Sequence, residues 1–458
     1  MDRDSIVAGR EAGSRGLQGG EYTRRNFVLV PFLIDNGGWT VFSAGVAASS
    51  SEPAILFTAF EPSGDDHAAV VIRELRRRHP TVPIYAWGGP KMQRAGATVI
   101  AETGHDAVVG IPGWDKIRQH QKMNRDIARW VSEHPEVRVH VPVDSPAANF
   151  PICKITKRHG IRVVHLVAPQ LWAWGEWRLK KLRRRTDLVL CLFPFEEDWF
   201  GRRGVPAKFI GHPLFDEPLD MDGLGERAKL LTEGSPRIGV LPGSRPAELR
   251  RNFPLLLNAF KALRREYPEM VGCVAATTET VRKQLYEWAN RSGGWPDGLD
   301  VRVGETDLVA RWCDFAMVVS GTVTLQLAKQ AKPMVIVYKV NELMYKLIAR
   351  RLITTKYFAL PNLIANQEII PELIPYFKGQ ERLATMCREL IGSPERLEAQ
   401  RLNLRSITAK FSGRMASLEA ADAIQEMAGL ADRPALPDNA MRSDTAKLSD
   451  AERADASA

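Results

Sequence analysis

The sequence predicts an α/β protein built from two doubly wound, Rossmann-like domains that face a cleft, followed by a disordered tail. Three observations support this fold class. Short β-branched runs alternate with segments of helical periodicity along most of the chain. A stretch rich in Gly, Pro and Asp, residues 211–226, interrupts that alternation near the middle. The length of 458 residues suffices for two or three domains that each bury a core.

The predicted strands follow one pattern from the first to the last. Residues 53–60 form an apolar run, and the helical spacing of Ala68, Val71, Ile72 and Leu75 follows it directly. Further runs of the same kind predict the remaining strands, at residues 137–143, 161–167, 186–193, 237–245, 314–322 and 332–340. Repeated βαβ units predict parallel sheets, which bind ligands at the carboxyl ends of their strands.

The same patterns predict the domain organisation. We expect a poorly defined extension in residues 1–52, an N-terminal domain in 53–213 and a C-terminal domain in 214–400. Residues 401–432 are expected to form helices that pack back on the N-terminal domain. Residues 433–458 contain few large apolar side chains, so we expect them to be disordered.

Composition narrows the protein class. The five cysteines form no CxxC pair, which disfavours a disulfide framework or a zinc knuckle and favours a reducing compartment. Neither a membrane-length apolar run nor a signal peptide is recognisable, so we expect a cytoplasmic protein.

The formal charge of +9 is locally concentrated. Six of the eight residues in 178–185 are cationic, and they follow the Trp-rich segment 172–177. A solvated helix face is the simplest interpretation, and a surface for phosphate groups or anionic lipid is the alternative. Nucleic acid is not an expected partner, because no recognition module accompanies the charge.

Two turns in the second half are candidate phosphate sites. Gly243, Ser244 and Arg245 follow a predicted strand and combine a close backbone approach, a hydroxyl and a forked cation. A second turn, residues 320–322, joins a strand to a helix whose first amides could bind an anion. An ordinary βα turn and a plain helix cap are the alternatives. Without a P-loop motif, the pair indicates a nucleotide diphosphate held by backbone and Arg.

Acidic residues end two predicted strands of the first half. Glu61 and Asp65 lie in the turn after the first strand, and Asp144 ends the run 137–143. A carboxylate there could act as a general base, although the residues alone slightly favour a capping Asp in an Asp-Ser-Pro turn. The acidic pair Asp220 and Asp222 lies in the linker, so we predict no obligatory metal and no cofactor.

Residues 54–425 resemble the lipid-A-disaccharide synthase family, which consists of inverting glycosyltransferases with the GT-B fold of two Rossmann domains. The resemblance rests on ten motifs that occur in the family's order. They are EPSGDDHAA (61–69), GGPKMQRAGA (88–97), VVGI (108–111), VDSP (143–146), HLVAPQLWAW (165–174), TDLVLCLFPFE (186–196), FIGHPLFD (209–216), LPGSRPAE (241–248), SGTVTL (320–325) and LPNLIANQEIIPEL (360–373).

The resemblance implies transfer of 2,3-diacylglucosamine from UDP-2,3-diacylglucosamine to 2,3-diacylglucosamine 1-phosphate, which forms the β-1,6-linked lipid A disaccharide phosphate and UDP. It implies that Asp144 is the catalytic base and that Glu61 is a second catalytic residue. The residues implied to bind UDP in the C-terminal domain are Gly243, Ser244, Arg245, Ser320, Gly321, Thr322, Gln326 and Asn362. The residues implied on the acceptor side of the N-terminal domain are Ser63, Asp65 and His67.

Acylated substrates also suggest a role for the basic segment. Aromatic rings at headgroup depth and cations facing anionic lipid would bind the protein to the inner membrane peripherally. The residues expected on this surface are Trp172, Trp174, Trp177, Lys180, Lys181 and Arg184.

Several positions depart from the family pattern. Ala59 stands where a Gly is usual, Gly175 replaces an Arg, and Gln326 replaces the Glu that commonly binds ribose hydroxyls. Asn366-Gln367 occurs in place of Gly-Arg. Two alternatives therefore remain open, a non-catalytic UDP- or lipid-binding descendant and a UDP-sugar transferase with another acceptor.

Overall fold

The structure is a computed structural model that describes residues 52–103, 114–340, 342, 345 and 355–431. The predicted N-terminal extension, apart from its last residue, and the predicted tail at 433–458 lie outside the described residues.

The first sheet contains seven parallel strands in the order β3-β2-β1-β4-β5-β6-β7. Its strands are β1 Ala54–Ala59, β2 Ile84–Gly88, β3 Thr98–Glu102, β4 Val137–Val143, β5 Arg162–Leu166, β6 Leu188–Cys191 and β7 Ala207–Phe209. The helices between them are α1 Pro62–Arg78, α2 Pro90–Arg94, α3 Trp114–Glu133, α4 Pro146–Arg158, the short η1 Glu176–Arg178, α5 Leu179–Arg185 and α6 Pro194–Gly201.

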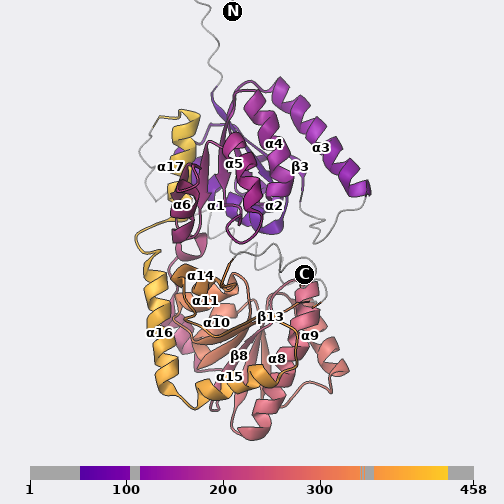
Figure 1. The fold of residues 1–458 in the computed structure, drawn as a ribbon, viewed down its shortest axis with the longest axis vertical. Coiled ribbons are helices and arrows are strands. Elements are labelled where there is room, and N and C mark those ends of the chain that lie inside the picture. The colour runs from indigo at the N-terminus through magenta and orange to yellow at the C-terminus, as the bar shows by residue number, and fades with distance from the viewer. Residues whose placement is uncertain (1–51, 104–113, 341, 343–344, 346–354, 432–458) are drawn as a thin grey trace, which may run out of the picture. The chain divides into compact units, whose positions relative to one another are not determined.

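The second sheet contains six parallel strands in the order β10-β9-β8-β11-β12-β13. Its strands are β8 Arg237–Leu241, β9 Val271–Ala276, β10 Leu299–Val303, β11 Phe315–Val319, β12 Met334–Lys339 and β13 Glu372–Tyr376. The accompanying helices are η2 Pro213–Phe215, α7 Met221–Ala228, α8 Pro246–Glu266, α9 Glu279–Arg291, α10 Thr306–Trp312, α11 Val323–Lys329, α14 Leu360–Ala365, α15 Glu381–Ile391, α16 Pro394–Ala409 and α17 Ala416–Ala428 (Figure 1).

Two parallel sheets confirm the predicted fold class. Every residue of β1 is buried, as expected for a strand covered by helices on both faces. Six strands had no counterpart among the predicted ones, namely β2, β3, β7, β9, β10 and β13. Strand β3 explains why: it lies at a sheet edge and is mostly exposed, so its residues show no continuous apolar run.

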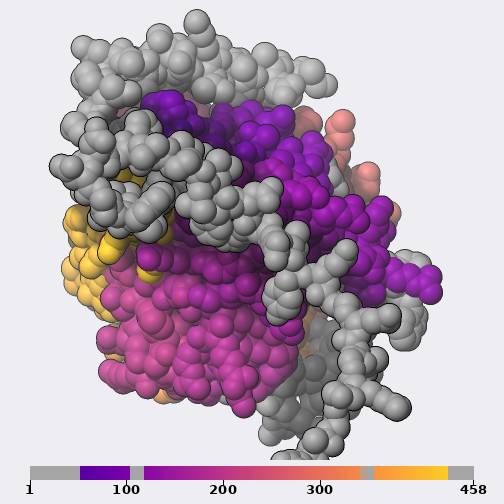
Figure 2. All heavy atoms as spheres, turned by 90° about the horizontal axis from the view of Figure 1, so that it is seen from above, coloured from indigo at the N-terminus to yellow at the C-terminus, as the bar shows by residue number. Residues whose placement is uncertain are grey.

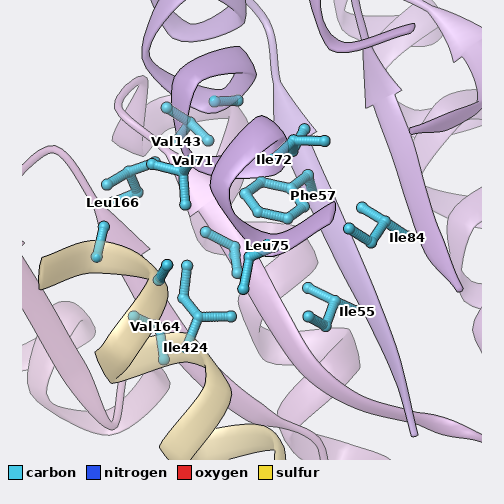
Figure 3. Close-up of a cluster of buried hydrophobic side chains, with 14 of the residues drawn as sticks. Ile55, Phe57, Val71, Ile72, Leu75, Ile84, Val143, Val164, Leu166 and Ile424 are labelled. Atoms are coloured by element: carbon cyan, nitrogen blue, oxygen red, sulfur yellow. The ribbon is translucent and has the colours of Figure 1, made fainter. Parts of the chain in front are cut away.

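Helix α17 packs against the first sheet, although it follows all strands of the second. Ile424 is fully buried in one cluster with Phe57 of β1 and Leu75 of α1 (Figure 3). In Figure 2 yellow residues of the C-terminal region lie directly beside residues of the first sheet's domain, which α17 contacts through α1, β4 and β5. The predicted boundary at residue 400 falls inside α16, which packs against α11 and α14 of the second domain.

The described residues contain no helix that is both long enough and apolar enough to cross a membrane. All five cysteines are free and buried.

Candidate functional site

Two carboxylates lie together where neighbouring strands of the first sheet end. Strands β1 and β4 pair in parallel up to Ala59 and Val143, so Glu61 and Asp144 follow at the same edge of the sheet. Ser145 joins the two turns, because its Oγ donates a hydrogen bond to Glu61 Oε1 over 2.6 Å. The predicted pair of catalytic acids is therefore brought together at a strand end.

The turn that carries Asp144 has a left-handed backbone. Asp144 has φ 46° and Ser145 has φ 38°, a region that L-residues adopt at a cost of about 1–3 kcal/mol each. Asn149, one turn into α4, supports this conformation, since its Nδ2 donates to the carbonyls of Val143 and Asp144 at 2.9 Å each.

A buried chain of polar side chains lies beneath this turn. Thr58 Oγ1 donates to Asn149 Oδ1 over 2.7 Å and lies 2.8 Å from Nε2 of His140. The other ring nitrogen of His140 lies 3.1 Å from Thr156 Oγ1. All four side chains are fully buried, so each of these bonds replaces hydration that burial has removed.

The surroundings of Asp144 favour its protonated form. Burial raises the pKa of Asp144 above its ordinary value, and the negative charge of Glu61 adds to the rise. The Ser145 amide and the Arg245 guanidinium oppose it. Burial also raises the pKa of nearby Glu196 to about 7, although its carboxylate accepts hydrogen bonds from the indole of Trp172 and from two backbone amides.

The second sheet supplies a cation to this group of acids. Arg245 follows β8 and stands at the N-cap position of α8, after a turn in which Gly243 adopts φ 93°. Its guanidinium donates to Glu248 Oε1 over 3.1 Å, and the same oxygen accepts from the Tyr338 hydroxyl over 3.3 Å. The side chain of Arg245 remains 66% exposed, so the anchored guanidinium is still accessible to an anion.

Arg245 and the acids of the first sheet sense one another electrostatically. The hydrogen bond that Arg245 donates to Glu248 and the charge of Glu61 both raise the pKa of Arg245, while the charge of Arg245 lowers the pKa of Asp144. Turns from the two sheets therefore contribute opposite charges to one site.

The second predicted phosphate turn lies beside the first. Strand β11 pairs with β8, so the turn 320–322 and the turn 243–245 end adjacent strands. A side-chain atom added at Gly321 would meet no atom within 4 Å, which leaves space in front of its backbone. Thr322 is exposed at the start of α11, and Gln326 is half-buried within that helix.

Asp65 does not face the acceptor side as predicted. Its carboxylate is buried and accepts three backbone N–H groups at the start of α2, from Gly89 at 3.2 Å, Lys91 at 3.0 Å and Met92 at 2.9 Å. Asp65 therefore caps α2 across the sheet edge. A side chain at Gly89 would lie within 2.4 Å of this carboxylate, so the contact requires glycine.

Asn362 likewise differs from the prediction that it contacts UDP. It is fully buried, and its amide donates to the carbonyl of Ile370 at 2.8 Å and to Glu372 at 3.0 Å. Its Oδ1 accepts from the amides of Ile369 and Ile370. These four bonds use the side chain to join α14 to β13.

The acceptor-side residues Ser63 and His67 are half-buried on α1. The ring of His67 lies edge-on to buried His212, with 6.0 Å between ring centroids. Burial lowers the pKa of His67, with Asp66 opposing that change. His67 thus contacts the segment between the two sheets.

The predicted lipid surface is only partly exposed. The prediction that Trp172 lies on this surface is wrong, because Trp172 is buried and its indole donates to Glu196 over 2.9 Å. Trp174 and Trp177 are 43% and 66% exposed, and the Arg178 guanidinium lies 4.3 and 5.0 Å from their ring centroids. The exposed cations of α5 are Lys180, Lys181, Arg183 and Arg184. We call Trp174, Trp177, Arg178 and these four cations the basic aromatic surface.

Sequence reasoning missed the residues that hold the charged groups in place. Asn149, Thr58 and Glu248 carry the turns of Asp144 and Arg245 through hydrogen bonds. A polar residue inside an otherwise apolar strand, as at Thr58, is a signal that could have identified this network.

Among the described residues, no group of three or more His, Cys, Asp or Glu side chains is placed to hold a metal ion.

Comparisons with known proteins agree on one family. Residues 55–425 match the family model described as lipid-A-disaccharide synthetase. The chain is 32% identical over 385 residues to a lipid-A-disaccharide synthase of Geobacter sulfurreducens, covering 82% of this chain and 97% of that protein. It is 35% identical over 376 residues to the enzyme of the same name from Anaeromyxobacter sp., covering 81% and 96%.

Solved structures share the fold at low sequence identity. The S. aureus MnaA–UDP co-structure matches with a TM-score of 0.55 and 12% identity, over 83% of this chain and 98% of that one. A UDP-GlcNAc 2-epimerase from Neisseria meningitidis bound to UDP-GlcNAc matches with a TM-score of 0.53 and 11% identity, over 82% and 100%.

We predict that Asn149→Ala lowers the free energy of unfolding by about 1–3 kcal/mol, because it removes the hydrogen bonds that Asn149 makes to Thr58 and to the carbonyls of Val143 and Asp144. Urea unfolding of the full chain measures the change. Asn290→Ala, at an exposed site on α9, is the matched control and should stay within about 0.5 kcal/mol of the parent. Equal losses in the two variants would contradict a supporting role for Asn149.

Proposed function

Since the chain belongs to the lipid-A-disaccharide synthetase family, we propose that it transfers 2,3-diacylglucosamine from its UDP donor to the 6-hydroxyl of 2,3-diacylglucosamine 1-phosphate. The chain is thus a UDP-sugar glycosyltransferase of lipid A synthesis, and the two named substrates are the proposal. The observation that carries it is the Asp144 carboxylate at a strand end, within electrostatic reach of Arg245 on the other sheet.

Asp144 is the proposed general base. It accepts the proton of the acceptor hydroxyl as the oxygen bonds to the anomeric carbon, and the bond from that carbon to the diphosphate breaks. The pKa of Asp144, raised by burial, makes its carboxylate a stronger proton acceptor than an exposed Asp. Glu61 accepts a hydrogen bond from the Ser145 hydroxyl. Its proposed part in the reaction is therefore to hold the turn that presents Asp144.

Arg245 is the proposed partner of the departing diphosphate. Its fork can bind two phosphate oxygens, and Glu248 already restrains the side chain before substrate arrives. Ser244 and the turn 320–322 border the same sheet edge and would complete the diphosphate site. Gln326 would hydrogen-bond the ribose. Neutralising the developing negative charge assists the departure of UDP.

We predict that the full-length protein releases UDP when given both acylated sugars, and that Asp144→Asn lowers kcat by at least about a hundredfold while UDP affinity stays nearly intact. A UDP-release assay measures turnover and calorimetry measures UDP binding. Because the base must be ionised, the parent rate should fall as the pH falls through the raised pKa of Asp144.

The matched control is Asp66→Asn, an exposed acid on α1 that pairs with Lys91. It should retain the parent rate and pH profile. Full activity of Asp144→Asn would exclude Asp144 as the base. If the parent protein releases no UDP with acylated sugars of natural chain length, the two proposed substrates are wrong.

We propose that transfer requires no metal ion, because Arg245 can supply the positive charge that the diphosphate needs. Arg245→Ala should weaken UDP binding by roughly ten- to a hundredfold, the loss of one charge-assisted contact. Arg265→Ala, an exposed site at the other end of α8, is the control. A chelator should leave turnover of the parent unchanged, and a rate lost on chelation and restored by a divalent cation would contradict the proposal.

We further propose that the basic aromatic surface binds the anionic face of the inner membrane. Trp174 and Trp177 expose apolar rings beside exposed cations, a combination suited to the headgroup region. The protein would then reach acylated substrates as a peripheral membrane enzyme.

Changing Lys180, Lys181, Arg183 and Arg184 to Gln should therefore abolish flotation with vesicles that contain anionic lipid, at about 1 kcal/mol of binding per cation. The control changes four exposed cations elsewhere, Lys229, Arg265, Lys283 and Arg291, to Gln, so that the net charge falls equally. Equal flotation of the two variants would place membrane binding on another surface.

A further inference from the structure

A cavity of about 470 Å³ lies between helix α6 and the segment around α14, and none of the functions above uses it. Its lining comes from both halves of the described chain. The lining residues are Trp172, Phe195, Asp198, Trp199, Arg202, Arg203, Thr355, Lys356, Tyr357, Leu363 and Asn366.

The walls of this cavity are mainly apolar. Trp172 and Phe195 meet edge to face with 5.0 Å between their centroids, and Trp199, Tyr357 and Leu363 are half-buried beside them. The indole N–H of Trp172 is already bonded to Glu196. These walls therefore offer rings and an aliphatic side chain to a ligand, which suits a hydrocarbon better than a group that needs hydrogen bonds.

The cavity also reaches the basic aromatic surface. Arg203 lines the cavity, lies 4.0 Å above the ring of Trp199 and donates to Glu176 over 2.8 Å. Glu176 lies in the chain between exposed Trp174 and Trp177. A chain that enters from a membrane on this surface would meet the cavity at Arg203.

Exposed cations complete the lining. Arg202 and Lys356 are both exposed and come from different halves of the chain, with one acid, Asp198, in the same lining. Arg245 is assigned to the donor diphosphate, so the 1-phosphate of the acceptor is the substrate anion that still lacks a cation. The charges of Arg202 and Lys356 suit that phosphate.

We propose that this cavity holds one acyl chain of the lipid acceptor, with the acceptor's 1-phosphate bound by Arg202 and Lys356. This proposal rests on the proposed function, because that function supplies the acylated sugar phosphate. The cavity lies at the same sheet edge as the base: Trp172 bonds Glu196, and the charge of Asp144 acts on Glu196.

The first test locates the chain without requiring turnover. Dodecyl phosphate with a terminal diazirine is photolysed with the full-length protein, and labelled residues are mapped by mass spectrometry. Labels should fall on Trp172, Phe195, Trp199 or Leu363, and unlabelled dodecyl phosphate should compete whereas inorganic phosphate should not. Leu363→Trp, which fills the cavity, should remove these labels. Labels confined to Trp174 and Trp177 would overturn the proposal.

The second test separates the two substrates. Leu363→Trp should raise the KM for the acceptor by about tenfold, the cost of withdrawing roughly two methylene groups from burial, and leave the KM for the donor unchanged. With an acetylated short-chain acceptor, Leu363→Trp and the parent should have the same acceptor KM. Arg202→Glu should raise the acceptor KM with either chain length, because it acts on the phosphate.

Matched controls use exposed sites of the second domain. Leu402→Trp on α16 and Arg265→Glu on α8 make the same chemical changes and should leave both KM values as in the parent. An unchanged acceptor KM in Leu363→Trp and Arg202→Glu, with normal turnover, would overturn the cavity assignment alone. Absence of turnover in the parent would remove the proposed function, and the labelling pattern would still decide what the cavity holds.

Discussion

The site depends on one buried hydrogen-bond chain, from Thr58 of β1 through Asn149 of α4 to the carbonyl of Asp144. Two successive left-handed residues without a glycine are costly, and the turn persists because Asn149 supplies the partners that its backbone needs. Thr58 lies on the neighbouring strand, so the turn is tied to the sheet and not only to its own helix. This connection holds the carboxylate of Asp144 at the sheet edge.

The second sheet presents the long cationic side chain of Arg245, whose freedom to move is limited by neighbouring residues. A free Arg side chain loses up to about 2 kcal/mol of conformational entropy when it is ordered. Glu248 restrains Arg245 before any substrate binds, and Tyr338 restrains Glu248 in turn. The guanidinium is nevertheless mostly exposed, so restraint and access to an anion coexist.

The sequence predicted features that follow from one rule of strand pattern or position. It did not predict which hydrogen-bond partner a polar side chain has in the fold. Parallel strands covered on both faces appear as apolar runs, which predicted the two sheets, and the rule of carboxyl-end ligand sites led to Glu61, Asp144 and Arg245. Asp65 obeys the same rule of position, yet backbone amides distant in the sequence occupy its polar atoms. Asn362, which only the resemblance implied, is likewise occupied, by the amides of Ile369 and Ile370. Likewise, no local pattern shows that the indole of Trp172 meets a buried carboxylate twenty-four residues later.

Burial of acids also resolves a conflict between the site and its anionic ligands. The charge of Glu61 acts on Asp144 and the charge of Asp144 acts on Glu196, near an edge where a diphosphate would meet negative charge. Burial raises the pKa of Glu196 to about 7 and raises that of Asp144, so both acids hold protons to higher pH than exposed carboxyls would. Asp144 must be ionised to act as the base, so the negative charge that burial can remove from this edge during the reaction is that of Glu196.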